Sequence, residues 1–99
     1  MRDESRYNGG GFPPITWTEG SEDHIARHGV TPAEVQASLY MRPRWVAAGR
    51  GDSTLVYAQT DAGRHLLIVV APASDGGTYI VTARDMTDSE QRTFRRKGR

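Results

Sequence analysis

Leu66-Leu67-Ile68-Val69-Val70 is apolar at every position, in a chain of 99 residues whose ends are polar. An amphipathic strand alternates apolar and polar residues, whereas an unbroken apolar run indicates a strand covered on more than one face. The run therefore predicts an inner strand of a sheet, with helices covering that sheet.

The same pattern of short apolar runs between turns continues on both sides of this strand. We expect strands at residues 44–48, 54–59, 65–71 and 78–83. The connections at residues 49–52, 61–63 and 74–77 are short and contain glycine. Such connections favour antiparallel neighbours. The second half of the chain thus predicts a four-stranded antiparallel sheet.

Two helices are expected ahead of the sheet. Ser21 is a suitable N-cap for a short helix that ends at Arg27, with Gly29 in the left-handed position. Thr31 and Glu34 have the spacing of a capping box, which predicts a second helix to about residue 40. Residues 15–17 form a short strand before the first helix.

A third helix follows the sheet, starting at the capping box of Thr87 and Glu90. The order of helices, meander and helix predicts the α+β class, as a small antiparallel four-stranded sheet packed by two N-terminal helices and one C-terminal helix. Residues 15–96 form the single domain. Residues 1–14 are expected to be a flexible N-terminal arm and residues 97–99 a basic tail.

Composition excludes several classes of function. The chain has no cysteine, which rules out disulfides, thiolate metal sites and a cysteine nucleophile. No stretch approaches the roughly 20 apolar residues that a membrane-spanning helix needs, so we expect a cytoplasmic protein with no membrane partner. The net charge is only +1, but arginine and lysine crowd the C-terminus. This asymmetry suits either contact with a polyanion or a solvated basic tail.

His24, Arg27 and His28 are spaced i, i+3 and i+4, which places them on one face if the segment is helical. They are candidates for acid–base and phosphate-binding roles in RNA cleavage. The alternatives are a surface position for His24 and a bond to a last-turn carbonyl for His28. The histidine pair also has zinc-ligand spacing, but the remaining histidine, His65, opens a strand, so neither a metal nor a cofactor is expected.

Two further arginines stand at strand ends. Arg64 begins the inner strand, and Arg84 ends the next one between apolar neighbours. A guanidinium in that position needs an anionic partner, either a substrate phosphate or a carboxylate. Glu34, Asp85 and Glu90 are the carboxylates that could pair with Arg84.

Three aromatic side chains leave a similar choice. Trp17, Trp45 and Tyr57 have rings on which bases can stack, but in so small a domain we assign them to the core.

Several of these motifs resemble those of the BrnT family, small toxins of bacterial toxin–antitoxin pairs, over residues 15–96. Arg27-His28-Gly29-Val30 is similar to the family's KHGV segment, Gly63-Arg64 to its GR strand start, and Thr82-Ala83-Arg84 to its SAR strand end. The early Trp17 and the helix start at Thr87 and Glu90 also match.

The resemblance implies a RelE/barnase-like fold and a metal-independent endoribonuclease that cleaves RNA and inhibits translation. Its implied partners are an RNA substrate and a cognate DNA-binding antitoxin protein. We assign catalytic roles to His28, Arg64 and Arg84, and substrate binding to Arg27, His24 and Arg92.

The chain also departs from the family pattern. Thr18 stands where the family has Asp, Gly20 or Ser21 replaces a Lys, His24 an Asn, Asp85 a Lys and Phe94 a Tyr. Lost lysines and an added carboxylate weaken attraction for phosphate. The departures therefore define an alternative: a catalytically altered module that binds a partner protein or nucleic acid, through its basic C-terminal helix, without cleaving it.

Overall fold

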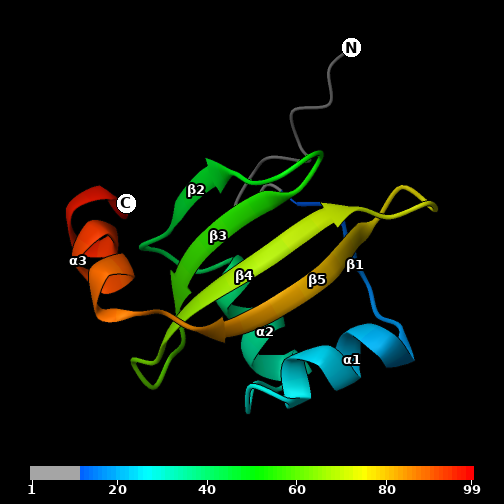
Figure 1. Cartoon of the computed structure of the whole chain (residues 1–99), viewed down its shortest axis with the longest axis horizontal. Helices are drawn as coiled ribbons and strands as arrows, with labels where there is room; N and C mark the ends of the chain where they lie inside the picture. Colours follow the sequence, from blue (N-terminus) through cyan, green and yellow to red (C-terminus); the bar gives the residue numbers. More distant parts are fainter. Residues whose placement is uncertain (1–11) are drawn as a thin grey trace.

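The structure, a computed structural model, describes residues 12–99 and confirms the expected α+β class (Figure 1). The elements in chain order are β1 (Ile15–Thr16), α1 (Glu19–Ala26), α2 (Pro32–Leu39), β2 (Trp45–Ala48), β3 (Thr54–Gln59), β4 (His65–Pro72), β5 (Thr78–Asp85) and α3 (Asp88–Lys97). The helices and strands expected from the sequence are all present. Most of the expected N-terminal arm, residues 1–11, lies outside the described residues.

The sheet has five strands in the order β1-β5-β4-β3-β2, and it is mixed. Strands β2 to β5 pair antiparallel as predicted, but β1 pairs parallel with β5 through Ile15 and Thr78. The prediction of a four-stranded, wholly antiparallel sheet is therefore wrong. The short strand at residues 15–17 was expected, but two residues contain too little pattern to predict the strand with which they pair. The place of β1 is set by a backbone bond of 2.9 Å from the Thr78 nitrogen to the Pro14 carbonyl.

The main core lies between the sheet and the first two helices. Ile25 of α1 and Val35 and Leu39 of α2 are fully buried against Ile68 of β4 and Ile80 of β5. Figure 1 shows α2 behind the sheet and α1 along β5. The even-numbered side chains of β4 thus supply the centre of the apolar core, in accord with the two-residue period of a strand.

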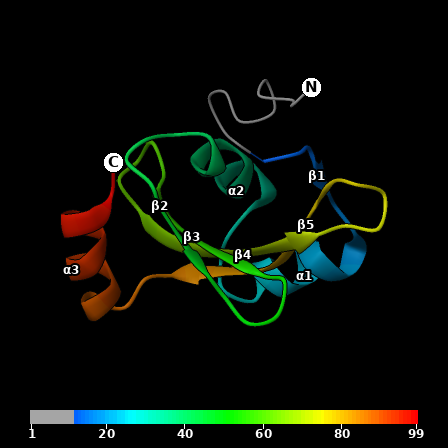
Figure 2. The ribbon, with the colours of Figure 1, turned by 90° about the horizontal axis from the view of Figure 1, so that it is seen from above.

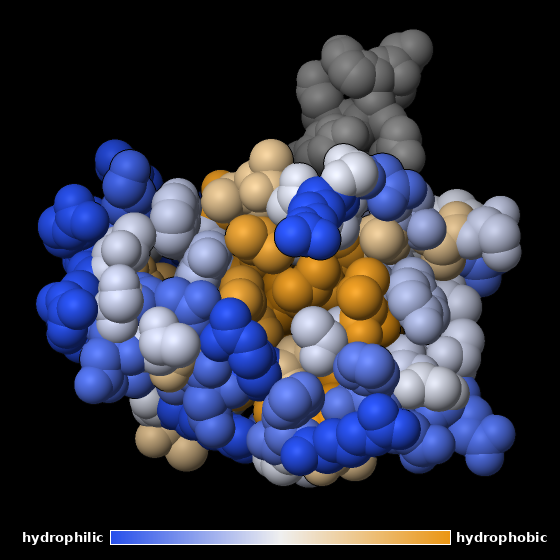
Figure 3. Space-filling view, viewed as in Figure 1, coloured by the Kyte–Doolittle hydropathy of each residue, from blue (hydrophilic) through white to orange (hydrophobic). Residues whose placement is uncertain are grey.

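The opposite face of the sheet is covered only at one end. There α3 packs Phe94 against Tyr57 and Leu67 in a second, smaller cluster. Figure 2 shows α3 beyond the end of the sheet and α2 across its other face. Leu55 and Val69 remain half-buried on this open face. Figure 3 shows an apolar surface over β3 and β4 surrounded by hydrophilic side chains. Helices therefore cover β4 fully on one face only.

All three helices begin with a threonine cap and a capping box. The boxes of α2 and α3 confirm the predicted starts at Thr31 and Thr87. The predicted start of α1 is wrong, because Thr18 is the N-cap and Ser21 is the third helical residue. Thr18 and Ser21 exchange two bonds of 3.0 Å between backbone nitrogen and side-chain oxygen, which satisfies both donors.

Residues 12–14 belong to the packed part of the chain. Phe12 packs against the main core, and its ring lies 5.6 Å from the Arg44 guanidinium carbon. The Pro13 carbonyl accepts a bond of 2.8 Å from the Thr78 hydroxyl. Packing therefore begins ahead of the domain start expected at Ile15. Within residues 12–99, no helix has the length and apolar character needed to cross a membrane.

Candidate functional site

Arg64 joins the turn between α1 and α2 to the ends of β4 and β5. Its Nε donates to Asp85 at 2.7 Å, and its Nη1 donates to Glu34 at 3.2 Å and to the Gly29 carbonyl at 2.9 Å. Its Nη2 donates to the His28 carbonyl and to Asp85, both at 3.3 Å. An arginine has five N–H donors, and every one of these is used. Arg64 therefore has no donor left over for a substrate phosphate.

The carboxylates around Arg64 are held in the charged form. The bond from the Thr31 backbone and the Arg64 guanidinium keep the pKa of Glu34 below its usual value of 4.5. Bonds from Arg64 lower the pKa of Asp85 in the same way. Both carboxylates bind Arg64, whose five donors are all occupied within the protein. This cluster, which we call the Arg64 hub (Arg64, Glu34, Asp85), is therefore built for holding structure.

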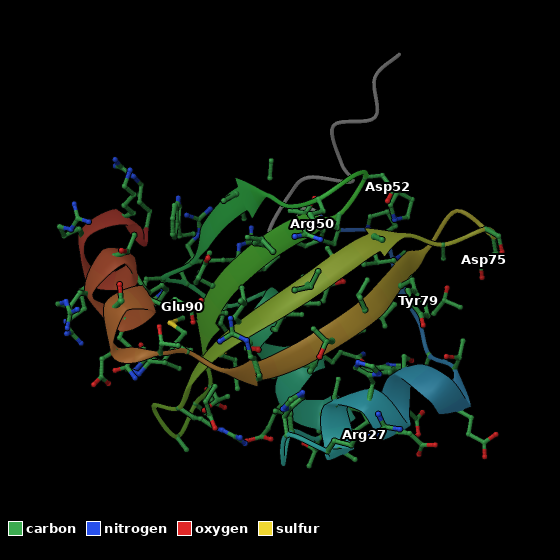
Figure 4. The ribbon with its side chains drawn as sticks, viewed as in Figure 1. Arg27, Arg50, Asp52, Asp75, Tyr79 and Glu90 are labelled. Atoms are coloured by element: carbon green, nitrogen blue, oxygen red, sulfur yellow. The ribbon has the colours of Figure 1, made fainter. Side chains whose placement is uncertain are left out.

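The basic segment expected on one helix face is divided by the end of α1. His24 is helical, whereas Arg27 and His28 follow the last helical residue, Ala26. The Gly29 nitrogen donates to the Ala26 carbonyl at 2.9 Å, and Gly29 has φ +70°, which confirms the predicted left-handed stop. The side chains of His24, Arg27 and His28 are exposed, and Figure 4 shows Arg27 at the α1 side, away from Glu90 on α3.

Arg84 has a different environment on the open face of the sheet. It forms a bidentate pair with Glu90 of α3, with both nitrogen–oxygen distances 2.9 Å, and a further bond to the Asp85 carbonyl. These bonds use three of its five donors, and the other two have no partner among residues 12–99. The Arg84 side chain is 37% exposed. Arg84 therefore retains N–H groups for an anion from solution.

Two side chains with polar rings, Tyr57 and His65, lie on the same face of the sheet as Arg84. Burial, and next the Glu90 carboxylate, raise the pKa of the Tyr57 phenol, which keeps it protonated as a donor. His65 lies opposite Gln59 and shares the face of Tyr57, since side chains two apart on a strand point the same way. Its ring meets the edge of Phe94 at a centroid distance of 5.7 Å. We call Arg84, Glu90, His65 and Tyr57 the α3-side cluster.

The structure separates two of the three predicted catalytic residues from the third. Arg84 and Asp85 are consecutive in β5, so their side chains point to opposite faces of the sheet. Asp85 pairs with Arg64 next to the His28 carbonyl, while Arg84 pairs with Glu90. Arg64 and His28 therefore belong to the helix side of the sheet and Arg84 to the α3 side. Arg92, predicted to bind substrate, is exposed on α3.

The sequence offered three carboxylates as partners for Arg84, and one of the three is its partner in the structure. Glu34 and Asp85 pair with Arg64, and only Glu90 pairs with Arg84. His65 and Tyr57 were not assigned to a site. Alternation along β4 predicts that His65 and Leu67 lie on the same face of the strand. That Tyr57 lies on this face too follows only from the pairing of Tyr57 with Leu67. That register depends on turn geometry as well as on pattern.

Over residues 12–99 no three histidine, aspartate or glutamate side chains gather closely enough to hold a metal ion. Comparison of the chain with known protein families, with curated proteins and with solved structures found no match.

Proposed function

We propose that this chain is a BrnT-like toxin of a type II toxin–antitoxin pair, with the RelE/barnase-like arrangement of helices and sheet, and that it cleaves RNA without a metal ion. The proposal places the reaction at the α3-side cluster. It keeps Arg84 from the set expected in the sequence and replaces His28 and Arg64 by His65 and Glu90.

The observation that carries the proposal is the state of Arg84. Its two unused donors lie on the open face, beside a carboxylate that Arg84 itself keeps ionised by lowering the pKa of Glu90. Metal-free RNA cleavage needs a cation for the phosphate oxygens and a base for the 2′-hydroxyl proton. The Arg84–Glu90 pair supplies both within one hydrogen-bonded unit.

The remaining requirement is an acid for the leaving group. As Glu90 takes the proton, the 2′-oxygen bonds to phosphorus and the bond to the 5′-oxygen breaks, leaving a 2′,3′-cyclic phosphate. In the proposal the 5′-oxygen receives its proton from the His65 side chain. The Tyr57 phenol, which burial keeps protonated by raising its pKa, donates to a phosphate oxygen.

The test is cleavage of a labelled single-stranded RNA by the purified protein in EDTA. Arg84→Ala, Glu90→Gln and His65→Ala are each expected to lower the rate about 10²-fold or more, the usual loss for one acid–base or charge-stabilising group. His28→Ala is the matched histidine control and should keep the wild-type rate. Activity lost in His28→Ala but retained in His65→Ala would instead place the reaction at the turn after α1.

A second candidate function is favoured by the carboxylates themselves. Glu90 already occupies two donors of Arg84, and the Arg64 hub uses all five donors of Arg64. A phosphate must compete with these anions. A catalytically altered module could bind RNA or a partner protein through α3 while Arg64 and Arg84 stay paired with their carboxylates. A folded wild-type protein that shifts RNA in a gel but does not cut it would support this function.

The toxin assignment includes a cytoplasmic location and a cognate DNA-binding antitoxin protein. If the assignment holds, expression of the chain alone should arrest growth. Expression together with a short reading frame from beside its gene should relieve the arrest.

A further inference from the structure

The C-terminal end of α3 and the start of β2 enclose a hollow that the proposed reaction does not use. It is lined by Trp45, Arg96, Lys97 and Arg99. Three of these four side chains are cations and the fourth is the indole of Trp45, and no aspartate or glutamate side chain lines the hollow. In Figure 3 the α3 side of this face is strongly hydrophilic. We call these four residues the Trp45 hollow.

Trp45 is held in place by one face of its ring. It stacks on Tyr57, directly across from it in the sheet, with ring centroids 4.6 Å apart and planes inclined by 23°. Near the ring lies the Lys97 ammonium, 5.7 Å from the centroid. Lysine is long and flexible, and a single exposed cation–π contact contributes only about 0.5–1 kcal/mol. The ring is therefore rigidly placed, while Lys97 is easily displaced from it.

The cations are positioned by the backbone. Arg99 exchanges two backbone bonds of 3.1 Å with Arg44, the residue before β2, so the end of the chain is tied beside Trp45. The turn that brings it there passes close over Phe94. A Cβ at position 98 would lie 2.9 Å from the Phe94 carbonyl oxygen, which only glycine avoids. The hollow is thus a built part of the fold.

We propose that the Trp45 hollow binds one nucleotide of single-stranded RNA, and this inference rests on the proposed function. The base stacks on Trp45 in the place of Lys97, and Arg96, Lys97 and Arg99 contact the flanking phosphates. Aromatic stacking beside a basic groove is the usual way in which proteins hold unpaired bases. Tyr57 links the two sites, because it stacks on Trp45 and belongs to the α3-side cluster. The hollow therefore positions the strand for Arg84 and Glu90.

The test uses Trp45 as its own reporter. The chain has two tryptophans, so Trp17→Phe leaves Trp45 as the only one. Trp17 packs on the helix side of the sheet, against the main core. This protein is titrated with a 2′-O-methyl RNA hexamer, which has no nucleophilic 2′-hydroxyl, and separately with inorganic polyphosphate. We expect the hexamer to quench the Trp45 fluorescence and polyphosphate to bind without quenching it.

Variants with matched controls complete the experiment. Trp45→Leu keeps an apolar contact on Tyr57 and should weaken hexamer binding about tenfold or more, as loss of one stacked base does. Arg99→Ala should weaken it and reduce its salt dependence by about one phosphate contact. Arg50→Ala, on the exposed turn before β3, should change neither. Thermal unfolding of each variant shows whether it is folded.

The outcomes separate this inference from the proposed function. Hexamer binding without quenching, or unchanged affinity in a folded Trp45→Leu protein, would overturn the nucleotide site, even if the wild type cleaves RNA at Arg84. Quenching and a tenfold loss in Trp45→Leu would establish the site, even if Arg84→Ala showed that no cleavage occurs.

Discussion

Among residues 12–99, Arg64 makes more side-chain hydrogen bonds than any other residue. Arg64→Ala removes the guanidinium donors from the Glu34 and Asp85 carboxylates and from the Gly29 carbonyl. We expect a loss of about 2 kcal/mol in the free energy of unfolding, since the site is partly screened by solvent. Urea denaturation measures it. Arg50→Ala removes an arginine from an exposed turn and should stay within about 0.5 kcal/mol of the wild type. Equal losses in both would mean that the hub contributes nothing.

The same hub predicts how stability depends on pH. Arg64 lowers the pKa of Asp85 in the folded state below its usual value of 3.8. The stabilisation is fully present above that value and is lost as pH falls through the folded pKa, because the unfolded chain takes up protons first. As pH falls from about 6 to about 3, the free energy of unfolding of the Asp85→Asn protein should therefore decrease less than that of the wild type. Asp85 is 62% exposed, so the difference should be below about 1 kcal/mol.

Asp61→Asn is the control for this pH dependence. It removes the same charge from an exposed turn and should leave the wild-type slope unchanged. Denaturation curves for the three proteins that ran parallel from neutral to acidic pH would contradict a stabilising role for Asp85.

At the scale of elements, two helices are tied to the sheet by the glutamate that caps them. Glu34 accepts from the Thr31 backbone at 3.0 Å and also binds Arg64. Glu90 does the same for Thr87 and Arg84. Each glutamate thus satisfies a helix donor and fixes the helix start against a strand end. The sequence pattern predicted both capping boxes because they are local, but the pairing with arginine depends on the sheet.

This double role predicts an ordered series at position 34. Glu34→Gln retains a side-chain oxygen for the capping box and loses the charge on Arg64, whereas Glu34→Ala loses both. We expect Glu34→Ala to be less stable than Glu34→Gln by about 1 kcal/mol, the usual value of a cap. Thermal unfolding of the two variants measures the difference. Equal melting temperatures would mean that the capping contact is not formed.

Two glycines are expected to respond in opposite directions. A Cβ on Gly77 would lie 2.5 Å from the Thr16 hydroxyl and 2.7 Å from the Pro14 carbonyl, so Gly77→Ala should push β1 away from β5. Gly20 lies inside α1 with its nearest contact at 3.9 Å, so Gly20→Ala should stabilise the helix by about 0.5–1 kcal/mol. Gly77→Ala should be destabilised by at least about 1 kcal/mol. Urea denaturation measures the free energy of unfolding of each variant. A Gly77→Ala protein as stable as Gly20→Ala would contradict the parallel pairing of β1.

At the scale of the whole molecule, the helices and strands could be predicted from the sequence, whereas their pairing and register could be predicted only in part. The apolar run in β4 and the glycine turns identified four strands because both signals are local. The parallel pairing of β1 with β5 and the split between Arg64 and Arg84 depend on long-range register, which no local pattern contains. The α3-side cluster follows from that register, because it places His65 of β4 on the same face of the sheet as Arg84, which pairs with Glu90 of α3. Candidate residues were therefore visible in the sequence before their grouping was.

The distribution of charge over the molecule makes the last prediction. The first turn of α1 is acidic, whereas the last turn of α3 is basic, so a polyanion should approach from the α3 end. Replacing Arg92 and Arg95 together by Glu reverses their charge and should weaken binding of the 2′-O-methyl hexamer. It should also reduce the slope of log affinity against log salt by about 0.7 for each lost phosphate contact. Replacing His24 and Arg27, exposed at α1, by Glu adds negative charge at the other end. Fluorescence anisotropy over a range of salt compares the pairs, and a greater loss from the α1 pair would place the RNA on the opposite side of the sheet from Arg84.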